Sequence, residues 1–169
     1  YLAIKDLGYT VKGVSWLPLE TNLTSKKPPI WGRIRHKLGY PVDRVNLNES
    51  FPSIVKEFVP EVIWVEKANT IYPKVYAAIK SEYPAIKIIY YSEDDIFIAN
   101  NRPVYLRKSL PLFDIVCTTK PRNIHELPKL GVRKVKCVYQ AYDKKIHRPL
   151  DLSESEQKEW GAEVSFIGT

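Results

Sequence analysis

The sequence is poor in the residues that bind metals or form disulfides. It has two cysteines and three histidines among 169 residues, and it has no methionine. Cys117 and Cys137 lie in separate apolar runs, and neither they nor the histidines show the spacing of metal ligands. We therefore expect two buried, free thiols in a reducing cytoplasm and no metal site.

Motifs that cradle phosphates or carry a nucleophile are also missing. The seven glycines do not form Gly-x-Gly-x-x-Gly after a strand, and there is no Walker A sequence. The sequence also lacks Gly-x-Ser-x-Gly, the elbow that presents the nucleophile in many hydrolases. These absences argue against a bound dinucleotide cofactor, an ATP site and the usual hydrolase site.

Long apolar runs are absent as well. No run approaches the roughly 20 residues that a membrane-spanning helix needs, and residues 1–8, with Lys5 and Asp6, do not resemble a signal peptide. We therefore expect a cytoplasmic protein. The chain opens on what reads as the end of a helix and closes on a strand running into a loop, so we also expect a fragment of a longer protein.

Positive charge is in excess. Lys and Arg number 26 against 19 Asp and Glu, which gives a formal net charge of +7. This balance favours anionic partners such as phosphates, acidic glycans or the surface of an anionic membrane. Hydrophobic residues at 44% and charged residues at 27% are ordinary for a globular domain, and the length suffices for one core.

Apolar runs that favour strands alternate with segments of helical spacing. The clearest run, residues 87–91, has four consecutive β-favouring residues after Lys87 and leads into three carboxylates at 93–95, which is typical of a strand buried in a parallel sheet. Strands are predicted over 10–16, 42–47, 62–65, 87–91, 113–118, 134–139 and 163–167, and helices over 1–7, 28–38, 51–59, 70–83, 104–110 and 121–130, with a short helix inside a linker at 144–161. This alternation predicts an α/β fold: a Rossmann-like open sheet, mostly parallel, with helices on both faces.

Polar residues follow four of the predicted strands. The carboxyl ends of parallel strands meet at one edge of a sheet, where ligands bind, so we expect these residues to line one cleft. The candidates are Glu66, Lys67, Glu93, Asp94, Asp95, Thr119, Lys120, Arg122, Gln140 and Tyr142. The carboxylates suit a general base or sugar hydroxyls, and the cations suit phosphate or carboxylate groups. The alternative is an acidic turn or a helix cap, because polar residues begin wherever a buried strand ends.

Seven stretches, in this order, carry a family resemblance: residues 60–67, 91–95, 113–120, 126–132, 139–143, 147–149 and 164–169. Their order resembles the N-terminal half of a GT-B glycosyltransferase, in the group of CgeB-like proteins and glycosyltransferase families 1 and 4. The resemblance covers about residues 54–169. Residues 1–149 would then form the acceptor-side domain, and residues 150–169 a linker and the first strand of a donor domain.

The resemblance also implies roles. In this family the nucleotide-sugar donor binds mostly to the C-terminal domain, so this part would shape the acceptor side and would not transfer sugar alone. Asp94 and Asp95 match the family's acidic pair and would act as acceptor ligands or base, with Lys120 and Gln140 flanking the cleft. The acceptor could be a glycan, a lipid-linked molecule or another hydroxyl compound. Neither a metal nor a cofactor besides the donor is implied.

Two rival functions remain open. A non-enzymatic basic α/β module would bind nucleic acid or an acidic polymer through the helix at 28–37 and a cluster of Lys129, Arg133, Lys134 and Lys136. A receiver-like regulatory domain would place an acidic pair, a Thr and a Lys at successive strand ends. Its acidic pair should follow the first strand, however, whereas here the pair comes after several elements.

Overall fold

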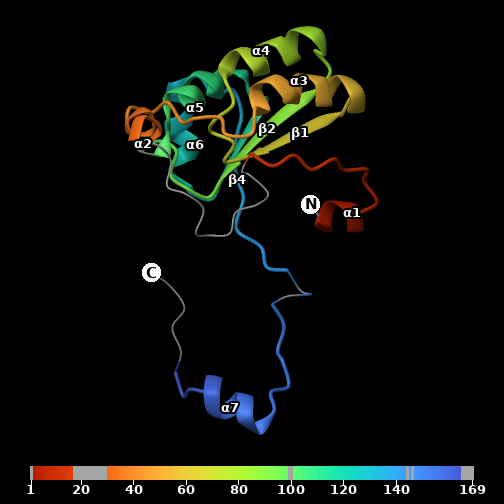
Figure 1. Cartoon of the computed structure of the whole chain (residues 1–169), viewed down its shortest axis with the longest axis vertical. Coiled ribbons are helices and arrows are strands. Elements are labelled where there is room, and N and C mark those ends of the chain that lie inside the picture. The colour runs from red at the N-terminus through yellow and green to blue at the C-terminus, as the bar shows by residue number, and fades with distance from the viewer. Residues whose placement is uncertain (1, 17–29, 99–100, 144, 146, 165–169) are drawn as a thin grey trace. The chain divides into compact units, whose positions relative to one another are not determined.

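A computed structural model describes residues 2–16, 30–98, 101–143, 145 and 147–164. The chain divides into two compact units, Tyr1–Tyr139 and Gln140–Thr169. The first unit contains α1 (Leu2–Asp6), α2 (Ile30–Lys37), α3 (Leu47–Phe58), β1 (Val62–Glu66), α4 (Pro73–Glu82), β2 (Lys87–Ser92), α5 (Val104–Ser109), η2 (Leu110–Leu112), β3 (Ile115–Thr118), α6 (Asn123–Glu126), η3 (Leu127–Leu130) and β4 (Val135–Cys137); the second contains α7 (Glu154–Trp160). Figure 1 labels most of these elements.

The four strands form one sheet in the order β1-β2-β3-β4, and each neighbouring pair is parallel. The register places Trp64 beside Ile89 and Ile89 beside Ile115. Helices α4, α5 and α6 connect successive strands, as parallel pairing requires. The predicted α/β fold with an open, Rossmann-like parallel sheet is confirmed.

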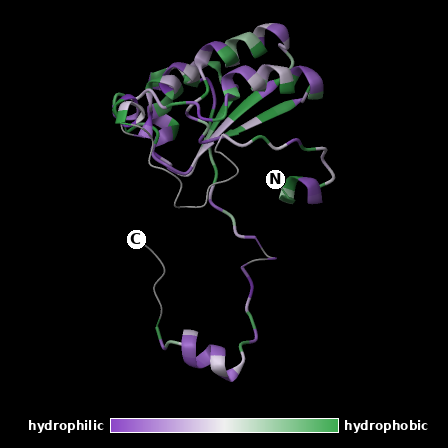
Figure 2. Ribbon diagram, in the orientation of Figure 1, coloured by the Kyte–Doolittle hydropathy of each residue, from purple (hydrophilic) through white to green (hydrophobic). Residues whose placement is uncertain are grey.

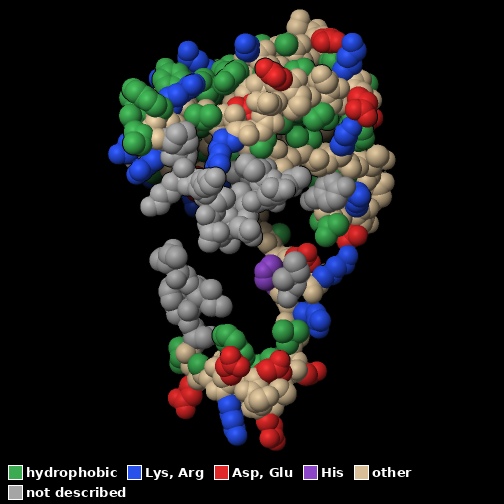
Figure 3. Space-filling model, viewed as in Figure 1, with side chains coloured by type: hydrophobic (Ala, Val, Ile, Leu, Met, Phe, Trp, Pro, Cys, Tyr) green, Lys and Arg blue, Asp and Glu red, His purple; other side chains and the backbone are tan. Residues whose placement is uncertain are grey.

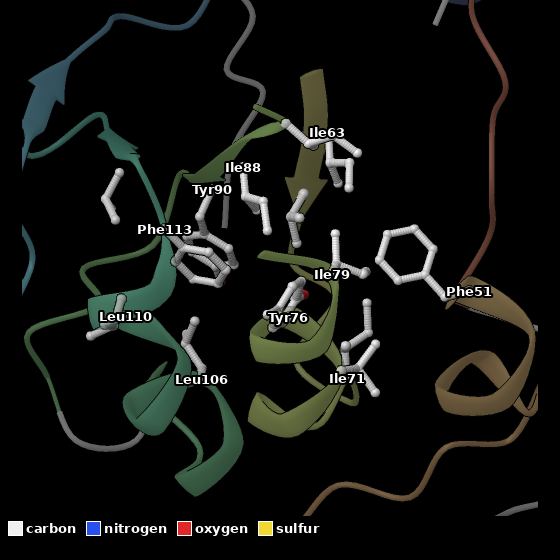
Figure 4. Packing of buried hydrophobic residues seen from close by; sticks show 14 of the residues in the cluster. Phe51, Ile63, Ile71, Tyr76, Ile79, Ile88, Tyr90, Leu106, Leu110 and Phe113 are labelled. Atoms are coloured by element: carbon white, nitrogen blue, oxygen red, sulfur yellow. The ribbon is translucent and has the colours of Figure 1, made fainter. Parts of the chain in front are cut away.

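The core lies between one face of the sheet and the helices. Alternate strand residues, such as Ile63 on β1 and Ile88 on β2, are buried against apolar side chains of α3, α4 and α5. Figure 4 shows these side chains between the strands and the helices, and Figure 2 shows that the strands are largely hydrophobic while the helices carry both kinds of residue. Phe113 stacks on Tyr90, with ring centroids 5.2 Å apart, and meets the edge of Tyr76 at 5.1 Å.

The opposite face of β1 is open. Val62 and Trp64 are each 49% exposed, and the Trp64 ring stacks on Tyr91 with centroids 5.7 Å apart. Helices were predicted on both faces of the sheet. At β1, helices of the described residues cover one face only.

Two predicted strands do not form. Residues 10–16 lie outside every helix and strand and are mostly exposed, although Val11, Val14 and Trp16 are residue types that favour strands. Residue type alone does not make a strand, because the backbone needs a neighbour to pair with. At 42–47, Asp43 accepts hydrogen bonds from the backbone N–H groups of Val45 and Asn48, so local bonds replace strand pairing.

Helix boundaries follow the local chemistry. The predicted helix at 121–130 divides at Pro128 into α6 and η3, and Gly131 ends it with a φ of 86°, a left-handed conformation that glycine adopts easily. The helix predicted at 51–59 begins four residues earlier: α3 starts at Leu47 after Asn46, and no side chain caps it. Asn48 instead accepts the N–H of Tyr72 at 2.6 Å, which ties α3 to the loop after β1.

In the second unit, the predicted short helix is present as α7. Ser153 and Glu156 form a reciprocal capping box at its start. The predicted strand at 163–167 lies mostly outside the described residues. Among the helices that the structure describes, none has the length and apolar character to cross a bilayer.

Candidate site at the carboxyl edge of the sheet

The ends of β1 and β2 bring Lys67 next to two carboxylates. Lys67 Nζ lies 3.7 Å from Glu93 Oε2 and 3.5 Å from Asp94 Oδ2. Lys67 has a φ of 49°, a left-handed conformation that strains a residue with a side chain. The Asp94 side chain is 55% exposed, so its carboxylate meets both the ammonium group and solvent.

Asp95 has a different environment. Its buried carboxylate accepts hydrogen bonds from Arg122, from Asn123 Nδ2 at 2.9 Å and from the backbone N–H of Phe97 at 3.1 Å. The Arg122 side chain remains largely exposed, and its Nε lies 4.0 Å from Glu126 Oε2. Asp95 therefore holds the guanidinium group of Arg122 and joins the loop after β2 to the start of α6. We call Lys67, Glu93, Asp94, Asp95 and Arg122 the edge cluster.

Asn123 is an important residue that the sequence analysis missed. It is fully buried, and its Nδ2 group donates to Asp95 and to Glu126 Oε2 at 3.0 Å, while its Oδ1 accepts the Thr118 hydroxyl at 3.1 Å. An amide is the side chain that can donate and accept in this way at once. The sequence did offer a signal for this residue: an asparagine directly after Arg122, in the turn from β3 into a helix.

Hydroxyl groups hold the loops of this edge together. The Thr119 hydroxyl donates to the backbone oxygen of Glu93 at 2.9 Å and so links the ends of β3 and β2. The Ser92 hydroxyl accepts the N–H of Asp94 at 3.1 Å, and the Thr118 hydroxyl accepts the N–H of Lys120 at 3.1 Å. The Lys120 side chain is exposed beside these loops.

Five predicted site residues are not members of the edge cluster: Thr119 and Lys120, which lie in the loop after β3, and Glu66, Gln140 and Tyr142. Glu66 ends β1 on the exposed side of that strand, in register with Tyr91. Gln140 and Tyr142 belong to the second unit, and their place at this edge stays a prediction.

The edge cluster offers acceptors and cations on one surface. Exposed carboxylates of Glu93 and Asp94 can accept hydrogen bonds from hydroxyl groups, and Lys67 and Arg122 can pair with phosphate or carboxylate oxygens. Among the described residues, no group of three or more His, Cys, Asp or Glu is placed to hold a metal ion. The arrangement therefore suits a polar ligand that carries hydroxyl groups.

In comparisons with known proteins, no protein-family model and no curated protein matches this chain. The resemblance to the N-terminal half of a GT-B glycosyltransferase accordingly stays a prediction.

Proposed function

We propose that this chain is the acceptor-side domain of a cytoplasmic glycosyltransferase, and that the edge cluster binds the acceptor. The observation that carries the proposal is the contact of Lys67 with Glu93 and Asp94 at the carboxyl edge of a parallel sheet. This is the edge at which open α/β sheets bind ligands. The two cysteines are free, which suits a reducing compartment.

Within this proposal, Asp94 is the general base. It is the more exposed carboxylate of the pair that the family resemblance singles out, and its Oδ2 lies 3.5 Å from Lys67 Nζ. Asp94 takes the proton of the acceptor hydroxyl as the hydroxyl oxygen bonds to the anomeric carbon of the donor. The nucleoside diphosphate leaves with the electron pair of the broken bond.

Asp95 serves as a positioning residue in the same proposal. Its oxygens accept hydrogen bonds from Arg122, Asn123 and the Phe97 backbone, so it orients Arg122 instead of taking a proton. Glu93 would bind a second hydroxyl of the acceptor. The nucleotide-sugar donor would be held by a further domain of the parent protein.

The test uses the product of the complete reading frame, incubated with a panel of nucleotide sugars and hydroxyl acceptors. Release of the nucleoside diphosphate is measured. We expect Asp94→Asn to lower kcat by about 100-fold or more, as loss of a general base does. Asp151→Asn, which changes an exposed carboxylate of the second unit, is the matched control and should leave kcat unchanged.

Full activity of Asp94→Asn would remove the proposed base. A folded full-length protein that releases no nucleoside diphosphate from any donor would remove the transferase assignment. If that protein were also retained on heparin or DNA in a salt-dependent way, the basic binding module would replace it.

A further inference from the structure

We propose that α2, together with the last turn of α5, is a docking surface for membranes that contain anionic phospholipids. The surface, which we call the α2 patch, consists of apolar Ile30, Trp31, Ile34 and Leu38 and basic Arg33, Arg35, Lys37, Arg107 and Lys108. It does not rest on the sugar-transfer proposal.

The apolar part of the α2 patch faces solvent. Trp31 is 76% exposed and Ile30 is 72% exposed, and α2 contains no buried residue. Ile30, Ile34 and Leu38 are spaced by four residues, so they lie along one side of the helix. Helices of globular proteins normally bury such a stripe against the core, whereas helices that lie in the membrane interface leave it free for the acyl chains.

The cations of the α2 patch come from two segments without acidic residues. Residues 30–42 contain three Lys or Arg and residues 101–113 contain another three, and neither segment contains Asp or Glu. Arg33, Arg35, Lys37, Arg107 and Lys108 are all exposed. Clusters of this kind on an amphipathic helix favour anionic headgroups, because each cation near the surface strengthens binding.

Specific contacts hold α2 and α5 together. The Val104 N–H donates to the Gly39 oxygen at 2.8 Å, and the Tyr40 ring meets the edge of Tyr105 with centroids 5.6 Å apart. Gly39 has a φ of 80°, and a Cβ there would lie 3.1 Å from Val104 Cγ2. The close approach of the two segments therefore depends on glycine.

A pocket lies beside this junction. It has a volume of about 370 Å³ and is lined by Tyr40, Tyr72, Pro73, Lys74, Val104, Tyr105 and Lys108. Lys74 and Lys108 add cations to three tyrosine rings. Figure 3 shows hydrophobic and Lys or Arg side chains gathered together over the part of the first unit that carries α2 and α5.

The composition of the α2 patch favours a membrane over other anionic partners. A nucleic acid would use the cations, but it gives Ile30, Ile34 and Leu38 no apolar environment. Tryptophan is enriched at the membrane interface, and Lys and Arg can extend from a buried stem to the headgroups. An anionic bilayer can accommodate the apolar residues of the α2 patch among its acyl chains and bind the cations of the patch with its headgroups.

The test is co-sedimentation of the 169-residue chain with vesicles of phosphatidylcholine, with and without phosphatidylglycerol. We expect retention on the anionic vesicles only, weakened by salt. The triple variant Arg33→Glu, Arg35→Glu, Lys37→Glu and the single variant Trp31→Ser should each lower the partition coefficient about tenfold or more. Circular dichroism verifies that each variant is folded.

Two controls match these changes. The first is the triple variant Lys129→Glu, Arg133→Glu, Lys134→Glu, which changes the total charge by the same amount at exposed positions outside the α2 patch. The second is Trp160→Ser, which removes a tryptophan of similar exposure, 72%, from α7. Neither should reduce binding. With brominated acyl chains, quenching of tryptophan fluorescence should fall in Trp31→Phe and persist in Trp160→Phe.

Equal loss of binding in both triple variants would mean general charge attraction and would overturn the proposal. So would a folded chain that binds no anionic vesicles at low salt. Binding of RNA that depends on Arg33, Arg35 and Lys37, without retention on vesicles, would assign the α2 patch to nucleic acid instead.

Discussion

Asp94 and Asp95 are neighbours in the sequence with opposite surroundings. The Asp94 side chain is mostly exposed beside Lys67, whereas Asp95 is buried and accepts bonds from Arg122, Asn123 and the Phe97 backbone. A carboxylate with charged and buried donors cannot lose its charge without weakening all of those bonds. We therefore expect Asp95 to contribute mainly to stability and Asp94 mainly to ligand binding.

We expect Asp95→Asn to lower the free energy of unfolding by about 2–3 kcal/mol, because a charged hydrogen-bond acceptor and its buried partners are affected. Asp94→Asn should change it by less than about 0.5 kcal/mol, as for an exposed position. Urea unfolding of both variants measures the difference. Equal losses, or a larger loss in Asp94→Asn, would contradict the assigned roles.

Lys67 combines strain with charge. Its left-handed backbone is unfavourable for any residue except glycine, and its ammonium group contacts Glu93 and Asp94. Strain of this kind often marks functional positions.

Two variants separate these effects. Lys67→Met loses the charge and keeps the strain, whereas Lys67→Gly loses both, so the glycine variant should be more stable by about 1 kcal/mol. Chemical unfolding measures this, and under the proposed function acceptor turnover should fall in both variants. If the methionine variant were the more stable one, backbone strain at this position would be refuted.

The sequence predicts part of this site. Lys67, Glu93 and Asp94 meet because parallel strands end at one edge, which is a rule of topology. The bonds among Asp95, Arg122 and Asn123 depend on how two loops fold, and no residue pattern specifies that. Proximity was therefore predictable, and the division of roles within the acidic pair was not.

At the scale of elements, Asp114 joins a helix to the sheet. Both carboxylate oxygens lie 2.8 Å from Lys80 Nζ in α4, and Oδ2 accepts the N–H of Ile88 in β2 at 2.8 Å. Partial burial by itself would raise the pKa of Asp114, but the hydrogen bonds from Lys80 and Ile88 bring that pKa below its ordinary value. The carboxylate therefore stabilises the fold when it is ionised.

This predicts a dependence on pH. Because the pKa of Asp114 is lower in the folded state than in the unfolded state, its charge stabilises the fold at pH values above the unfolded-state pKa of about 3.9. This stabilisation is lost as the pH falls through the folded-state pKa. Asp114→Asn should therefore be less stable than the wild type at pH 7, and the difference should shrink as the pH falls below about 4. Urea unfolding across this range tests it, and a difference that stays constant would contradict the role of the charge.

Elements could be predicted where burial decides them. The strands at 62–66 and 87–92 follow from apolar runs that the core requires. Residues 10–16 also contain residues that favour strands, but strand formation there depends on a pairing partner that the segment does not specify. A local pattern therefore suffices where the core buries a strand, and it fails at 10–16, where most residues are exposed.

At the scale of the molecule, the described buried hydrophobic residues lie between Leu47 and Val132, and α7 has no buried residue. The core thus belongs to the unit Tyr1–Tyr139. Stability should follow that unit alone, because burial of apolar surface dominates folding.

We expect a chain that ends at Tyr139 to unfold cooperatively, with a free energy of unfolding within about 0.5 kcal/mol of the full chain, as for changes outside the core. Thermal and urea unfolding of the two proteins provide the comparison. A truncated chain without a cooperative transition would show that residues 140–169 contribute to the core.

The open side of β1 has a practical consequence. In the described part of the chain no strand pairs with its outer edge, and Val62 and Trp64 are half exposed next to that edge. Unpaired backbone groups beside apolar rings can template the addition of a strand from another molecule, which is how edge-to-edge aggregates begin. Concentrated solutions should therefore become turbid over time, and a lysine in place of Val62 should keep them clear.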